Sequence, residues 1–132
     1  MSQAKPDDTF AEISHIVWQH LVERGWDDPA PEPRSLAISL SLEANELLEH
    51  YQWSKKPVGN KEDLGEELAD ILIYALQYAH VIGVDPASII RDKLAKSALK
   101  YPAENFKGIK GEDRSKAWLE AKMKHRENKK SL

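Results

Sequence analysis

The stretch "GEELADILIYALQYAHVIG", from Gly65 to Gly83, decides the fold of this chain. Its apolar residues occupy most of the circumference of a helix, which is more than packing on one side requires. From Leu68 to Val84 the only formally charged residue is Asp70. An unpartnered carboxylate costs roughly several kcal/mol to bury. The stretch therefore predicts a helix at the centre of a bundle, in a subunit interface or in both, with a specific partner for Asp70.

The remaining sequence carries helix signals and no strand signals. Thr9 and Glu12 in "TFAE" form a capping-box pattern before an amphipathic segment. Asn60 and Asp63 have the same spacing just before the stretch quoted above. Proline and glycine residues mark most of the other helix ends. The expected helices cover about residues 9–25, 34–53, 60–83 and 86–101, followed by a short helix around Trp118 and a frayed end.

Length and composition suit one small helical domain. The chain has 132 residues, of which 41% are hydrophobic, enough for a single core. Four helices with short links favour an antiparallel bundle. We therefore expect an all-α fold in which residues 1–106 form an antiparallel four-helix bundle. Residues 107–132 hold nine Lys or Arg against four Asp or Glu, so we expect a basic C-terminal extension that is partly helical or frayed.

Composition also excludes several classes of function. Without cysteine the chain has neither a disulfide framework nor a thiolate site. Its first residues, "MSQAKPDDTF", lack the apolar core of a signal peptide, and no apolar run is long and charge-free enough to span a bilayer. The acidic balance of residues 1–106 argues against binding to nucleic acid backbones. These features indicate a cytoplasmic protein with neither a membrane nor a nucleic acid partner.

Four carboxylates stand in two pairs that have the same spacing. Glu43 and Glu46 lie three residues apart on the second expected helix. Glu67 and Asp70 repeat this spacing on the third, so each pair points to one side of its helix. A short link makes the two helices antiparallel neighbours, which brings the pairs together. Because like charges repel unless a hard cation lies between them, the set predicts a Mg²⁺ site at which Mn²⁺ can substitute.

Two other interpretations of these acidic residues are weaker. A single glutamate is usually a solvated surface residue, but Glu43 and Asp70 both interrupt apolar stripes and each has an acidic partner. A di-iron centre would use the ExxH spacing that Glu12 and His15 have. Such a centre needs a second ExxH motif, which the sequence lacks, and the capping box already explains Glu12. We therefore favour magnesium.

The two acidic motifs resemble those of a known family. "LEANELLEHYQW", residues 42–53, followed by "EELADILIY", residues 66–74, is similar to the ExxE…ExxD signature of MazG-like all-α nucleoside triphosphate pyrophosphohydrolases. "PRSL" before the first motif, "YQW" at its end and "KYP" at the end of the fourth expected helix resemble the dCTP pyrophosphatase-like branch. The resemblance covers about residues 10–107 and implies the MazG-like fold.

The resemblance implies a house-cleaning enzyme that hydrolyses a (d)NTP, such as dCTP or a modified nucleotide, to the monophosphate and pyrophosphate. Mg²⁺ would neutralise the triphosphate and lower the pKa of an attacking water. Glu43 and Glu46 are the implied catalytic residues, with Glu46 orienting that water or taking its proton. The implied metal ligands are Glu43, Glu46, Glu67 and Asp70.

The resemblance also implies substrate-binding residues. Trp26, Trp53 and Tyr74 match aromatic positions that surround the base, and an aromatic ring can stack on a base. Core packing is the alternative for each of these aromatic residues. On the fourth expected helix, the implied substrate contacts, for which solvated side chains are the alternative, are Lys93, Ser97 and Lys100.

A second class of function stays open at this point. The acidic cluster could bind metal structurally, or serve assembly, in a helical bundle that is not an enzyme. Release of pyrophosphate in the presence of Mg²⁺ would separate the two classes. In either class the largely apolar third helix predicts a homo-oligomer, either a dimer or a tetramer.

Overall fold

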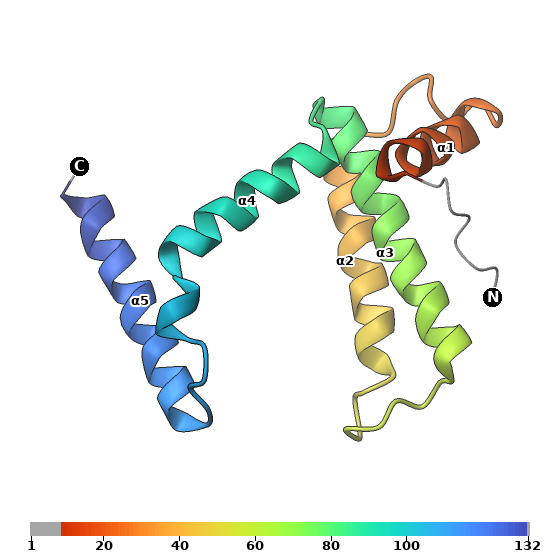
Figure 1. Ribbon diagram of the computed structural model, residues 1–132. Helices are drawn as coiled ribbons and strands as arrows, with labels where there is room; N and C mark the ends of the chain where they lie inside the picture. Colours follow the sequence, from red (N-terminus) through yellow and green to blue (C-terminus); the bar gives the residue numbers. More distant parts are fainter. Residues whose placement is uncertain (1–8, 132) are drawn as a thin grey trace. The chain divides into compact units, whose positions relative to one another are not determined.

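The computed structural model describes residues 9–131 (Figure 1). Within this range every regular element is helical, which confirms the all-α class. The chain divides into two compact units, one that extends through Ala87 and one that begins at Ser88. The predicted domain boundary after residue 106 stays a prediction. The helices are α1 (Phe10–Val22), α2 (Pro33–Glu49), α3 (Lys61–Ile82), α4 (Pro86–Lys100), the short 3-10 helix η1 (Ala103–Asn105) and α5 (Glu112–Lys130).

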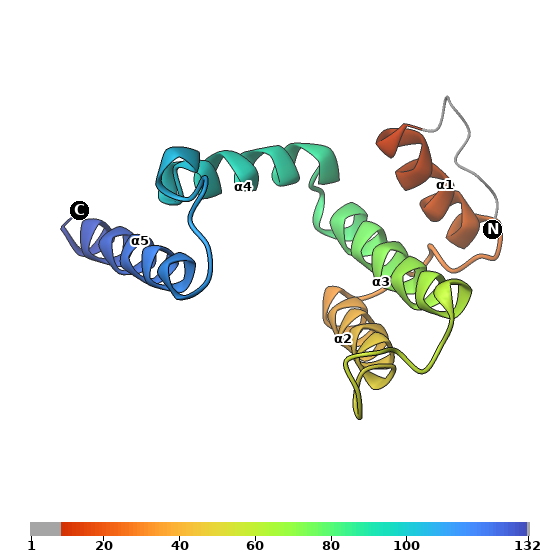
Figure 2. The ribbon, with the colours of Figure 1, turned by 60° about the horizontal axis from the view of Figure 1, so that its bottom comes forward.

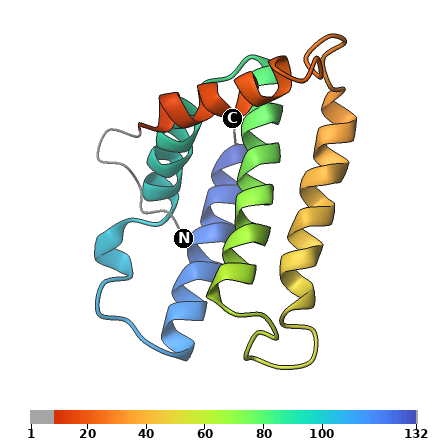
Figure 3. The same cartoon turned by 90° about the vertical axis from the view of Figure 1, so that its right-hand side faces the viewer.

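The first unit is a helical hairpin crossed by another helix. α2 and α3 run antiparallel and side by side (Figures 1 and 2), as expected for two helices joined by a short link. α1 lies across the C-terminal end of α3 (Figure 3). Among the described residues of this unit, those that are buried are Leu21, Leu36, Leu76 and Ala79, together with the polar Gln77. Most of them belong to α3, which agrees with the central place predicted for this helix.

Both predicted capping boxes are present. The hydroxyl of Thr9 accepts a hydrogen bond from the Glu12 N–H at 3.2 Å, and the Thr9 N–H donates to the Glu12 carboxylate at 2.7 Å. The Asn60 side chain accepts from the N–H groups of Glu62 and Asp63, and the Asn60 N–H donates to Asp63 at 2.8 Å. These bonds satisfy N–H groups that have no partner in the first turn of a helix. α3 therefore begins at a defined residue, which sets the direction in which its acidic residues point.

The expectation that the second helix runs to Trp53 is wrong. α2 ends at Glu49, and the chain leaves the helix at His50. The His50 carbonyl accepts a hydrogen bond from the Val58 N–H at 2.9 Å, so the chain returns to the end of α2 after a short loop. Trp53 lies in this loop, outside the helix. The helix ends early because the backbone of His50 closes the loop instead of continuing the helix.

The second unit holds most of α4, with η1 and α5. Tyr101 stacks on Trp118, with 6.4 Å between ring centroids, and meets Phe106 edge to face at 5.8 Å. α5 covers 19 residues, so the expected C-terminal helix is present and is longer than the short helix around Trp118 that the sequence indicates. Its sequence is rich in helix-forming Ala, Glu and Lys. Acidic residues also occupy its first turn and basic residues its last, which favours the helix electrostatically.

The hairpin leaves large apolar side chains exposed. Leu68 and Leu72 on α3, and Ile38 and Leu42 on α2, are each about half exposed in the single chain. The exposed residues leave apolar surface on both helices that carry the acidic motifs.

In the part of the chain that the structure describes, no single helix has the length and apolar composition needed to cross a membrane, although α3 and α4 meet these criteria together as a bent pair.

Candidate active site

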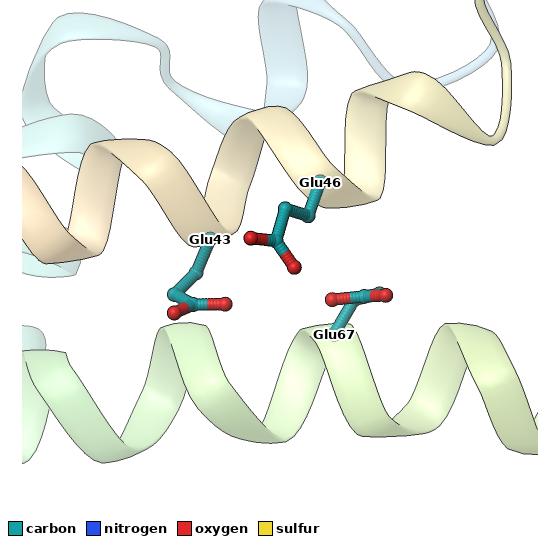
Figure 4. Close-up of side chains that lie close together, drawn as sticks. All are labelled: Glu43, Glu46 and Glu67. Carbon is teal, nitrogen blue, oxygen red and sulfur yellow. The ribbon is translucent and has the colours of Figure 1, made fainter.

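Three glutamates from the two hairpin helices meet in one cluster. Glu43 and Glu46 lie on α2 and Glu67 on α3, and one carboxylate oxygen from each lies within 4.8 Å of the other two. Figure 4 shows Glu43 and Glu46 projecting from α2 into the space that Glu67 enters from α3. The three-residue spacing puts both α2 side chains on one side of the helix, and the antiparallel hairpin brings Glu67 opposite them. Three of the four predicted metal ligands therefore come together.

Asp70, the fourth predicted ligand, lies three residues beyond Glu67 on α3. It is close enough to Glu43 to contribute to raising the pKa of that residue, and it lines a cavity beside the cluster. Asp70 is exposed in the single chain, although it stands in a largely apolar stretch of α3. Leu72 and Ile73, which follow it by two and three residues on α3, are exposed in the single chain as well. The metal-binding role of all four carboxylates stays a prediction.

The electrostatics of the cluster favour a bound cation. Burial is the largest cause that raises the pKa of the half-buried Glu43, followed by repulsion from Glu46, Asp70 and Glu67. A counter-charge among these groups would remove the repulsion. Hard divalent cations prefer carboxylate oxygens, whereas zinc and copper favour nitrogen or sulfur. The donor set therefore fits Mg²⁺ or Mn²⁺.

The raised pKa of Glu43 predicts how the stability of the metal-free protein depends on pH. In the unfolded chain Glu43 titrates near its ordinary pKa of 4.5, and in the folded chain it titrates higher. The folded state therefore binds more protons between these two values, so the free energy of unfolding falls as the pH rises through this window and then levels off.

Denaturant titrations in a metal chelator from about pH 4 to about pH 8 measure this effect in the wild type and in Glu43→Gln. We expect the stability of the wild type minus that of the variant to decrease as the pH rises. A difference that is constant or increasing across this range contradicts the raised pKa.

Beside the cluster, the first unit contains a cavity of about 570 Å³ lined by residues of all three of its helices. Asp70 and Tyr74 line it from α3, and Trp26 lines it from the connection between α1 and α2. Two of the three predicted aromatic residues are thus brought to one cavity. Its volume lies in the range of small-molecule sites. The polar groups in its lining, besides Asp70 and Tyr74, are His20, Ser35, Ser39 and Gln77.

The third predicted aromatic residue, Trp53, lies elsewhere. Its side chain is 84% exposed in the loop between α2 and α3, and it does not line this cavity. Core packing, the alternative that the sequence left open for Trp53, is therefore excluded in the single chain. Its contact with a base stays a prediction.

The predicted substrate contacts of the fourth helix belong to the second unit. Lys93, Ser97 and Lys100 are spaced three or four residues apart on α4, so they share one side of the helix. Lys100 also lines a cavity of about 500 Å³ within this unit, together with Phe106 and other residues of η1 and α5. Their role in binding phosphate stays a prediction.

Sequence motifs did not reveal three residues near the site. His50 Nε2 lies 3.6 Å from a carboxylate oxygen of Glu67. Gln77 is buried on α3 and lines the cavity, as does His20 on α1. The histidines have no metal-ligand spacing, so their positions depend on the tertiary fold. For Gln77 the available signal was its place three residues after Tyr74, which puts both on one side of α3.

Several known proteins are similar to this chain. Residues 38–114 match the MazG-like family. Mouse (Mus musculus) dCTP pyrophosphatase 1 is 29% identical over 111 residues, which cover 78% of this chain and 65% of that protein. Human (Homo sapiens) dCTP pyrophosphatase 1 is 31% identical over 106 residues, which cover 74% of this chain and 62% of that protein. The crystal structure of a pyrophosphatase from Archaeoglobus fulgidus matches with a TM-score of 0.63 and 30% identity, over 76% of this chain and 99% of that one.

The matches cover different shares of this chain and of the proteins that it resembles. The chain spans less than two thirds of the length of the mouse and human relatives. The region that matches the family contains α3 and every carboxylate of the acidic cluster. It also covers more than half of the chain. The chain therefore belongs to the MazG-like family.

Proposed function

We propose that this chain is a Mg²⁺-dependent nucleoside triphosphate pyrophosphohydrolase that converts a (d)NTP to the monophosphate and pyrophosphate. The observation that carries the proposal is the cluster of Glu43, Glu46 and Glu67 within the region that matches the MazG-like family. The names of the mouse and human relatives make dCTP, or a modified nucleotide, the first substrate to test. Removal of such a nucleotide from the cellular pool is the proposed biological role.

The acidic residues divide the work of binding and proton transfer. Glu43, Glu46, Glu67 and Asp70 are the proposed ligands of Mg²⁺. When bound, the metal would neutralise the triphosphate and make a water molecule more acidic. Glu46 is the proposed group that orients the attacking water or accepts its proton, because it is more exposed than Glu43 or Glu67. The water attacks the α-phosphorus, and pyrophosphate leaves.

The cavity beside the cluster is the proposed site for the base and sugar. Tyr74 and Trp26 offer aromatic faces for stacking. Asp70 belongs both to the cavity lining and to the acidic side of α3, so a nucleotide in the cavity would extend its phosphates toward Glu43 and Glu46. Gln77, whose amide is both a donor and an acceptor, is the proposed polar contact for a base edge.

A nucleotide panel tests the proposal. The purified full chain is incubated with each canonical dNTP and NTP, and with modified cytosine deoxynucleotides, in Mg²⁺ or in excess chelator, and pyrophosphate is measured. We expect release with at least one nucleotide, dependent on Mg²⁺ or Mn²⁺ and abolished by the chelator. If no nucleotide yields pyrophosphate with either metal, the alternative of a non-catalytic metal-binding bundle is favoured.

We also predict that the protein forms a homo-oligomer. The half-exposed Leu68 and Leu72 on α3, with Ile38 and Leu42 on α2, would otherwise leave apolar surface in water. Light scattering at micromolar concentration should give two or four times the chain mass of 15.0 kDa. A fully active monomer at this concentration would contradict the prediction.

A further inference from the structure

We propose that His50 is a positioning residue that holds Glu67 in place for the metal, and that Gly59 in turn holds His50. This inference rests on the proposed metal-binding function of the acidic cluster. It assigns a function to the loop between α2 and α3, which supplies none of the predicted metal ligands. The observations that carry it are the two contacts of the His50 ring and the space around Gly59.

One ring nitrogen of His50 is bound by the loop. The N–H of Gly59 donates a hydrogen bond to His50 Nδ1 at 3.1 Å, and the neighbouring Val58 N–H donates to the His50 carbonyl at 2.9 Å. The side chain of His50 is 17% exposed. The loop therefore holds His50 through its backbone carbonyl and through Nδ1 of its ring. Both contacts lie where the loop returns to the start of α3.

The hydrogen bond at Nδ1 determines what the other nitrogen can do. Because Nδ1 accepts a hydrogen bond, it carries no proton, so in the neutral ring Nε2 carries it and acts as a donor. Nε2 lies 3.6 Å from a carboxylate oxygen of Glu67, whose side chain is 23% exposed. A shift of a few tenths of an ångström would close a hydrogen bond. Outer hydrogen bonds of this kind orient carboxylates that bind metals.

Gly59 is required for this close approach. A Cβ atom at Gly59 would lie 2.5 Å from Cε1 and 2.6 Å from Nδ1 of the His50 ring, and 2.9 Å from the Cβ of Asp63. The backbone at Gly59 does not have the positive φ that favours glycine elsewhere. Glycine is therefore needed at this position because a side chain would collide with the His50 ring. Any larger residue would push the imidazole away from Glu67 or the loop away from α3.

Two substitutions at His50 separate its two contacts. In His50→Asn the shorter amide can still accept the Gly59 hydrogen bond at the Nδ1 position, but no donor reaches Glu67. In His50→Gln the longer amide places a donor near the Nε2 position. Mn²⁺ binding to the full chain, measured by titration without nucleotide, reports on Glu67 directly, and thermal melts in chelator report on the loop.

We expect His50→Asn to bind Mn²⁺ about 10- to 100-fold more weakly than the wild type, with its melting temperature in chelator unchanged. His50→Gln should recover most of the affinity. Gly59→Ala should also weaken Mn²⁺ binding. In a chain that already carries His50→Asn, the same substitution should weaken binding much less, because the contact between residue 50 and Glu67 is already lost.

Other outcomes overturn the inference. Wild-type affinity in His50→Asn would show that His50 only closes the loop. Equal losses in His50→Asn and His50→Gln would show that a donor at the Nε2 position does not hold Glu67 in place. A wild type that binds Mn²⁺ but hydrolyses no nucleotide refutes the proposed function and leaves the comparison of the variants valid. A wild type that binds no Mn²⁺ refutes both.

Discussion

Asp70→Asn should reduce Mg²⁺-dependent turnover by at least about 100-fold. This loss is larger than the one expected when a residue that only hydrogen-bonds to a metal ligand is replaced. The substitution keeps the size of the side chain and removes one anionic ligand from the proposed metal site. It also removes one of the charges that raise the pKa of Glu43. The metal-free variant should therefore be as stable as the wild type or more stable. Pyrophosphate release and thermal melts in chelator measure the two effects.

Glu66→Gln is the matched control. Glu66 lies next to Glu67 on the same helix, but it is exposed and lies outside the cluster. Glu66→Gln removes one negative charge, as Asp70→Asn does, and leaves the proposed ligands in place. It should keep near wild-type turnover. If Asp70→Asn also retains wild-type turnover, Asp70 is not a metal ligand and the reaction depends only on the three clustered glutamates.

Tyr74→Ala should raise KM by about 5- to 150-fold, the equivalent of the roughly 1–3 kcal/mol that an aromatic ring contributes by stacking on a base. The effect should appear mainly in KM, because stacking stabilises the bound substrate and the transition state alike. The α-phosphorus lies away from the base, so kcat should change little. Steady-state kinetics with the preferred nucleotide measure both constants. A fall in kcat with KM unchanged contradicts a stacking role for Tyr74.

Trp53→Ala provides the comparison. Trp53 is 84% exposed, so its truncation should leave the melting temperature close to that of the wild type, as surface substitutions usually do. We expect KM to rise without a loss of stability if Trp53 also meets the base, as the resemblance implies. An unchanged KM would show that Trp53 takes no part in binding the substrate.

The acidic cluster was predictable because its geometry is local. The three-residue spacing fixes Glu43 and Glu46 on one side of α2, and a short link between antiparallel helices is enough to bring Glu67 opposite. The start of α3 was predictable for the same reason, since the capping box of Asn60 and Asp63 involves only neighbours in sequence.

The parts that the sequence did not predict depend on contacts between distant residues. The early end of α2 depends on the hydrogen bond from the Val58 N–H to the His50 carbonyl. The spacing of apolar residues in the sequence does not indicate this bond. The approach of His50 to Glu67 requires the loop to return over the ring, where Gly59 leaves room for it. Asp70 is exposed within a largely apolar stretch, and the spacing of apolar residues alone does not define how much of each side chain the tertiary fold covers.

The identity of the bond that is cleaved tests the central claim most directly. The wild-type chain is incubated with Mg²⁺ and the nucleotide of the panel that it hydrolyses fastest, and the products are followed by phosphorus NMR. Attack at the α-phosphorus predicts that nucleoside monophosphate and pyrophosphate appear in equal amounts, and that neither appears in excess chelator. Nucleoside diphosphate and orthophosphate as the first products, or an unchanged spectrum for every nucleotide, would contradict the proposed function.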